Sequence, residues 1–131
     1  MAIAPPQLSL LPALKRLVEI ADLPADWDAE GADPPSAKAV AAASYLIEAA
    51  ADDQERRARG RIAPTTSSPI PDGGLQLEWQ GPGARIDVQA NPDGSYGYLV
   101  KWGRDDSARY EEADEAPLDI VLALIDRVLG Q

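Results

Sequence analysis

The chain has 131 residues, the length of one domain, with a formal net charge of −10 and neither cysteine nor histidine. The missing residue types exclude disulfides, thiolate nucleophiles, histidine bases and the usual zinc sites. The negative charge argues against nucleic acid and anionic lipid as partners and favours basic ones.

The N-terminal segment, MAIAPPQLSLLPALKR, has no basic residue ahead of its apolar run, so it does not resemble a signal peptide. No apolar run approaches the roughly 18 residues of a membrane span. We therefore expect a cytoplasmic protein that has no association with a membrane.

Two helices are predicted in the N-terminal half. Apolar residues recur at helical spacing over 9–22, and Pro24 prevents that helix from continuing. The second helix is expected over 36–58, with Ser36 as its N-cap and a narrow stripe of small residues along one face.

The connector between these helices, DWDAEGADPPSA, raises the question of a metal site. Asp26, Asp28, Glu30 and Gly31 match the first half of a calcium-binding EF-hand loop, but Ala37 occupies the position of its closing glutamate. The more economical interpretation is structural, with the ring of Trp27 buried against the helices. The alternative function is a divalent-cation or small-ligand module that uses the acidic 26–33 connector, through Asp26, Asp28, Glu30 and Asp33.

The hydrophobic period changes to two after the stretch IAPTTSSPIPDGG, which we expect to be a loop. Strands are predicted over 74–80, 84–90 and 95–102, separated by the turn sequences QGPGA and NPDGS. A fourth strand over 107–113 is an open alternative.

The last helix is predicted over 117–129, with a broad apolar stripe that can cover one face of the sheet. Residues 1–131 should thus form a single α+β domain. Its two N-terminal helices precede a three- or four-stranded antiparallel meander, and the C-terminal helix packs on the sheet.

Two short patterns are similar to those of a set of small bacterial proteins. The pattern W-D-x-x-G-A-x-x-P begins at Trp27, and G-G-x-x-L-E-W runs from Gly73 to Trp79. The set has no established activity, so the resemblance implies a shared fold and transfers no function or site residue.

The chain lacks histidine and cysteine, two of the side-chain types that most often catalyse reactions. Glu78 and Asp87 are expected to lie across adjacent strands, and paired carboxylates can perform acid–base work as in glycosidases. Acids on the solvent side of a sheet are more often inert. We therefore expect neither an enzyme nor a cofactor.

Aromatic residues of the third predicted strand suggest a second kind of site. Tyr96, Tyr98 and Trp102 should share one face with Trp79 of a neighbouring strand. They are core residues if helices cover that face, and a protein-recognition patch if it is open.

A cluster of basic residues, Arg56, Arg57 and Arg59, lies near the end of the second helix. These side chains could contact a partner, or they could pair locally with the neighbouring acids. Together, these features predict a small acidic protein that acts by binding another protein. Such a protein could be an inhibitor, an antitoxin or immunity-type partner, or an accessory subunit, and a neighbouring gene could encode its partner.

Overall fold

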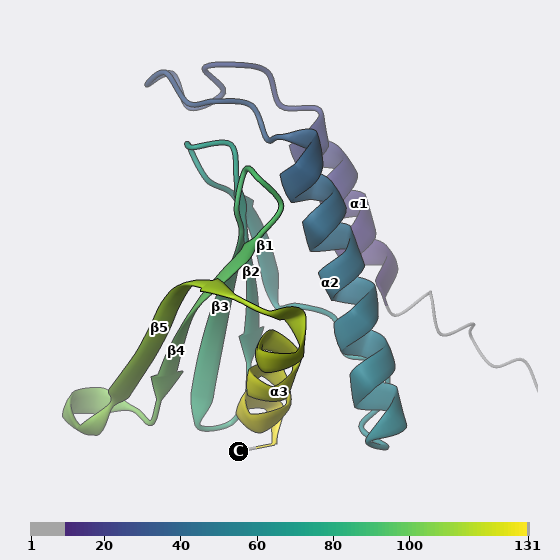
Figure 1. The fold of residues 1–131 in the computed structure, drawn as a ribbon, viewed down its shortest axis with the longest axis vertical. Helices are drawn as coiled ribbons and strands as arrows, with labels where there is room; N and C mark the ends of the chain where they lie inside the picture. The colour runs from purple at the N-terminus through teal and green to yellow at the C-terminus, as the bar shows by residue number, and fades with distance from the viewer. Residues whose placement is uncertain (1–9, 131) are drawn as a thin grey trace, which may run out of the picture.

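The computed structural model describes residues 10–130, which form three α-helices and a five-stranded antiparallel sheet (Figure 1). The helices are α1 (Leu11–Ala21), α2 (Ala37–Arg56) and α3 (Leu118–Leu129). The strands are β1 (Thr66–Pro69), β2 (Leu75–Gln80), β3 (Ala84–Ala90), β4 (Tyr96–Trp102) and β5 (Arg109–Ala116), with a short 3₁₀ turn, Asp105–Ser107, before β5.

The strands lie side by side in chain order, each antiparallel to the one before it. Trp79 of β2 is opposite Ile86 of β3, which is in turn opposite Val100 of β4. All three side chains are fully buried, and each such burial stabilises the fold by roughly 1.5–3 kcal/mol. The predicted alternation therefore builds the apolar face of this sheet.

The helices cover that apolar face, while no helix of residues 10–130 lies on the other face of the sheet (Figure 1). The last helix, α3, packs on β2, β3 and β4, and Val121 and Ile125 enter the core. Small buried residues such as Ala43 and Ala50 bring α2 close to its neighbours. None of the three helices in residues 10–130 combines the length and apolar character that a bilayer crossing requires.

The α+β class and the C-terminal helix packed on an antiparallel sheet are as predicted. Ser36 is the N-cap of α2, and its Oγ accepts a hydrogen bond from the backbone N–H of Ala39 at 3.0 Å. The predicted start of the first helix at residue 9 lies outside the described residues.

Two strands differ from the prediction. The fourth predicted strand is real and extends further, to Ala116. The segment that was expected to be a loop contains β1, which pairs with β2 from Thr66 opposite Glu78 to Pro69 opposite Leu75. Its sequence, TSSP, has no apolar alternation, so only its pairing with β2 identifies it as a strand.

Candidate functional site

The acidic connector is held together by its own hydrogen bonds. Asp26 Oδ1 accepts from the N–H of Gly31 at 2.6 Å, and Asp28 Oδ1 accepts from the N–H of Ala32 at 3.0 Å. In the described part of the chain, no three acidic side chains gather in a group that could hold a metal ion. The structure thus uses the Asp26 and Asp28 carboxylates to shape the loop, and it does not bring them together with Glu30 and Asp33 as ligands.

Trp27 lies differently from the prediction. Its ring is half-buried and does not belong to the hydrophobic core. Its indole Nε1 instead donates to the carbonyl oxygen of Asp33 at 2.9 Å. The ring therefore closes the connector loop rather than anchoring it in the core, because the loop extends beyond the ends of the helices (Figure 1).

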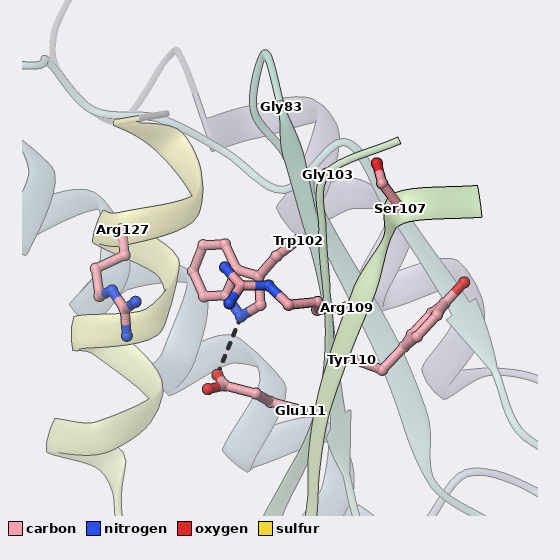
Figure 2. A pocket seen from close by; sticks show the side chains of 8 residues that line it. All are labelled: Gly83, Trp102, Gly103, Ser107, Arg109, Tyr110, Glu111 and Arg127. Atoms are coloured by element: carbon pink, nitrogen blue, oxygen red, sulfur yellow. Dashed lines mark hydrogen bonds between the residues drawn. The ribbon is translucent and has the colours of Figure 1, made fainter. Parts of the chain in front are cut away.

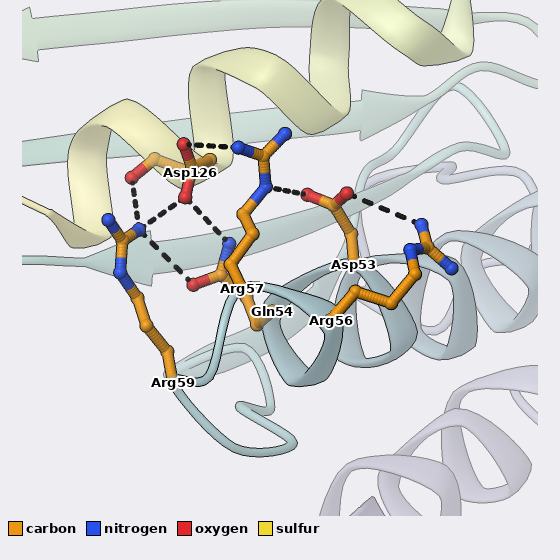
Figure 3. Close-up of polar contacts among 6 residues, drawn as sticks. All are labelled: Asp53, Gln54, Arg56, Arg57, Arg59 and Asp126. Carbon is orange, nitrogen blue, oxygen red and sulfur yellow. Dashed lines mark hydrogen bonds and ion pairs between the residues drawn. The ribbon is translucent and has the colours of Figure 1, made fainter.

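The arginines at the end of α2 pair with carboxylates of the protein itself (Figure 3). Arg57 lies 3.0 Å from Asp53 Oδ2 and 3.2 Å from Asp126 Oδ2, so it joins α2 to α3. Arg59 also pairs with Asp126, and Arg56 lies 3.4 Å from Asp53. These contacts favour a structural role over the predicted partner-binding role, which stays a prediction.

The aromatic residues of β4 lie on the face that the helices cover. Tyr96, Tyr98 and Trp102 are half-buried and pack against the core. The hydroxyl of Tyr96 donates to the carbonyl oxygen of Ala42 in α2 at 2.7 Å, and burial raises the pKa of this phenol. The structure therefore contains no open aromatic sheet face at these positions, and Trp102 borders a surface groove.

Glu78 and Asp87 are neighbours across β2 and β3, as predicted, on the sheet face without helices. Arg85 lies 3.9 Å from a Glu78 oxygen and 3.7 Å from Asp87 Oδ2. Asp87 is only 7% exposed, and its Oδ1 has no hydrogen-bond partner within residues 10–130. Burial raises the pKa of Asp87, and the charge of Arg85 partly opposes that rise.

The two edges of the sheet differ strongly. At one edge, β1 is only four residues long, and the Arg16 side chain of α1 donates to the Ser67 carbonyl oxygen at 3.3 Å. At the other edge, β5 has eight residues, and its outer side pairs with no other strand among the described residues. An unpaired edge presents backbone N–H and C=O groups that can template a further strand.

The side chains of β5 make this open edge acidic. Six of its eight residues are exposed and two alanines are half-buried. The exposed residues include the four acids Glu111, Glu112, Asp114 and Glu115. The strand was expected only as an alternative, and this edge role was missed. A run of acids on both faces of a strand is itself a signal for an edge strand.

A groove of about 600 Å³ lies at the N-terminal end of β5, between β4, β5 and the last turns of α3 (Figure 2). The Arg127 guanidinium carbon lies 4.7 Å from the ring centroid of Trp102, a cation–π distance. The Trp102 indole Nε1 donates to Glu111 at 3.1 Å. Arg109 is directly opposite Trp102 in the β4–β5 register and borders the same groove.

Neither Arg109 nor Arg127 has a carboxylate within ion-pair distance inside residues 10–130, in contrast to the arginines at the end of α2.

Comparison of the chain with family models, with curated proteins and with solved structures gives no match. The resemblance of the two short patterns to small bacterial proteins therefore stays a hypothesis.

Proposed function

We propose that this protein binds a basic segment of another protein, which adds as an extended strand to the outer edge of β5. The observation that carries this proposal is an exposed, acidic sheet edge that no other strand of residues 10–130 pairs with, whereas the other edge is short and contacted by Arg16. In strand addition, backbone hydrogen bonds provide affinity and side chains provide specificity.

The backbone of β5 is held ready for such pairing. Its register with β4 is regular from Arg109 to Ala113, and a β-bulge interrupts it between there and Ala116. Pairing with β4 fixes the extended conformation of β5 before any partner arrives, so little ordering entropy is lost on this side of the interface.

The charge of β5 selects among possible strands. Antiparallel pairing of two copies of β5 would bring like charges together, because each copy contributes Glu111, Glu112, Asp114 and Glu115. The same charges discourage uncharged strands, a common protection of exposed edges. A segment rich in lysine or arginine is attracted instead, and the overall charge of −10 increases its association rate.

A simple probe tests the proposal. The probe is a fluorescently labelled peptide in which lysine alternates with threonine, amidated at its C-terminus, and its binding is followed by fluorescence anisotropy. We expect the double variant Glu112→Lys/Glu115→Lys to weaken binding about tenfold, because exposed ion pairs contribute about 0.2–1 kcal/mol each and reversal adds repulsion.

Two controls separate strand addition from general attraction to an acidic protein. The variant Glu48→Lys reverses an exposed charge on α2, away from β5, and should change the affinity less than about threefold. A peptide with a methyl group on every backbone nitrogen keeps its charge but can donate no backbone hydrogen bond from either edge, and it should bind poorly. Equal binding of the methylated peptide, or no hydrogen-exchange protection of β5 amides, would refute the proposal.

A further inference from the structure

We infer that the groove at the N-terminal end of β5 is a carboxylate site, and that its occupant is the free C-terminus of the basic segment that pairs with β5. This inference rests on the proposed function and adds to it the end of the partner chain that is recognised. The observation behind it is the pair of guanidinium groups that border the groove, those of Arg109 and Arg127 (Figure 2).

The direction of pairing decides which chain end reaches the groove. β5 begins at Arg109, beside the groove, and runs away from it to Ala116. A strand that adds antiparallel to β5 therefore has its C-terminus beside Arg109. Antiparallel pairing is the arrangement of every neighbouring pair in this sheet, and it is slightly more stable per residue than parallel pairing.

The charges along the edge match a basic segment that ends in a free carboxylate. Glu112, Asp114 and Glu115 follow one another along β5, where lysine or arginine side chains of the segment would lie. The last residue of the basic segment would lie beside Arg109 and Arg127. Neither arginine pairs with a carboxylate inside residues 10–130. A parallel strand would bring an N-terminal ammonium group to the same two arginines, which repel it.

Glu111 also borders the groove, and its negative charge has to be reconciled with an anionic ligand. Its carboxylate accepts the indole N–H of Trp102 at 3.1 Å, and it lies beyond ion-pair distance of Arg109 and Arg127. The indole thereby holds Glu111 away from both guanidinium groups. Arg127 in turn lies against the Trp102 ring, 4.7 Å from its centroid, which restricts the guanidinium to the groove wall.

The test compares the lysine–threonine peptide with a free C-terminal carboxylate and the same peptide as its amide. We expect the free acid to bind about tenfold more tightly, the effect of charge-assisted hydrogen bonds to guanidinium. The net charge of the amide is one unit more positive than that of the acid. General attraction to a protein of charge −10 would therefore make the amide bind more tightly than the acid.

Variants locate the effect. In Arg109→Gln/Arg127→Gln the preference for the free acid should fall to within about twofold. Both arginines are exposed, so neither substitution disturbs the core. The control is Arg56→Gln, which removes an arginine whose side chain is 70% exposed and lies outside the groove, and it should retain the full preference. A preference that survives in the double variant would overturn the assignment to this groove.

The outcomes separate this inference from the proposed function. Equal binding of acid and amide would overturn the carboxylate site and leave strand addition intact. If neither peptide binds, strand addition fails, and N-acetylglycine and its amide then probe the groove alone through the indole N–H resonance of Trp102. The carboxylate site is supported if N-acetylglycine shifts that resonance, its amide does not, and the shift is absent in the double variant. If N-acetylglycine causes no shift, the assignment of a carboxylate site to this groove is wrong.

Discussion

Replacing Asp87 with valine should raise the free energy of unfolding. The position is central in the sheet, with Glu78 on one neighbouring strand and Leu99 on the other. The residue is 7% exposed, and its Oδ1 has no hydrogen-bond partner within residues 10–130. Burial removes water from this carboxylate, and Oδ1 receives no hydrogen bond in exchange, which destabilises the folded state.

The size of the effect follows from two opposing contributions. An unsatisfied buried acceptor costs about 1–3 kcal/mol, and valine removes that cost and suits a strand. Against this, Arg85 loses an ion pair of 3.7 Å, which contributes at most about 1 kcal/mol because the arginine side chain is 43% exposed. We therefore expect a net gain of about 1–2 kcal/mol at neutral pH.

The gain should depend on pH. Burial raises the pKa of Asp87 in the folded protein above its ordinary value of 3.8, so the folded state binds this proton more tightly than the unfolded state. The contribution of Asp87 to stability consequently falls as the pH rises from 3.8 through the folded pKa. The difference between variant and wild type should be smaller near the ordinary pKa than at neutral pH.

Urea denaturation, followed by tryptophan fluorescence to which the buried Trp79 contributes, measures both quantities. The matched control is Glu112→Val on β5, an exposed acid on the same sheet face, for which we expect little change in stability. A variant that is less stable than wild type at neutral pH, or equally improved at acidic and neutral pH, would refute the reasoning about Asp87.

Three further predictions concern stability and are checked by the same denaturation assay. Ser36→Ala should cost about 1–2 kcal/mol, because the N–H of Ala39 loses its cap and the carbonyl oxygen of Pro92 loses the hydroxyl that donates to it; Ser36→Asp should restore the cap but not the bond to Pro92. Ile125→Ala should cost about 2–5 kcal/mol, since the side chain is fully buried beneath the sheet. Asp126→Ala should cost about 1–3 kcal/mol, because Arg57 and Arg59 lose the carboxylate that joins α2 to α3; added salt should shrink that difference.

Local patterns in the sequence were enough to predict the centre of this fold. Alternation over β2, β3 and β4 places Trp79, Ile86 and Val100 on one face, because side chains of a strand point alternately to opposite sides. The apolar stripe of α3 needs an apolar surface to pack against. The sequence therefore predicted that this helix packs on the apolar face of the sheet. These signals are strong because burial of apolar area is the largest favourable contribution to folding.

Tertiary contacts decided the features on which the proposed function depends. Whether Arg57 faces a partner or Asp126 depends on α2 and α3 meeting, although the two residues are far apart in the chain. Likewise β1 became a strand only because β2 offered it hydrogen bonds. The groove joins Trp102 and Arg109 to Arg127 because β4, β5 and α3 come together at one end of the sheet.

The sequence determined one property of the open edge of β5, and the tertiary structure determined another. The sequence alone determined its charge, since four of its eight residues are acids. Its position at the edge was decided when β1 and α1 occupied the opposite side of the sheet and the helices covered a face. The charge of β5 is fixed by the identity of its own residues. Whether another strand lies beside β5 depends instead on where every other element packs.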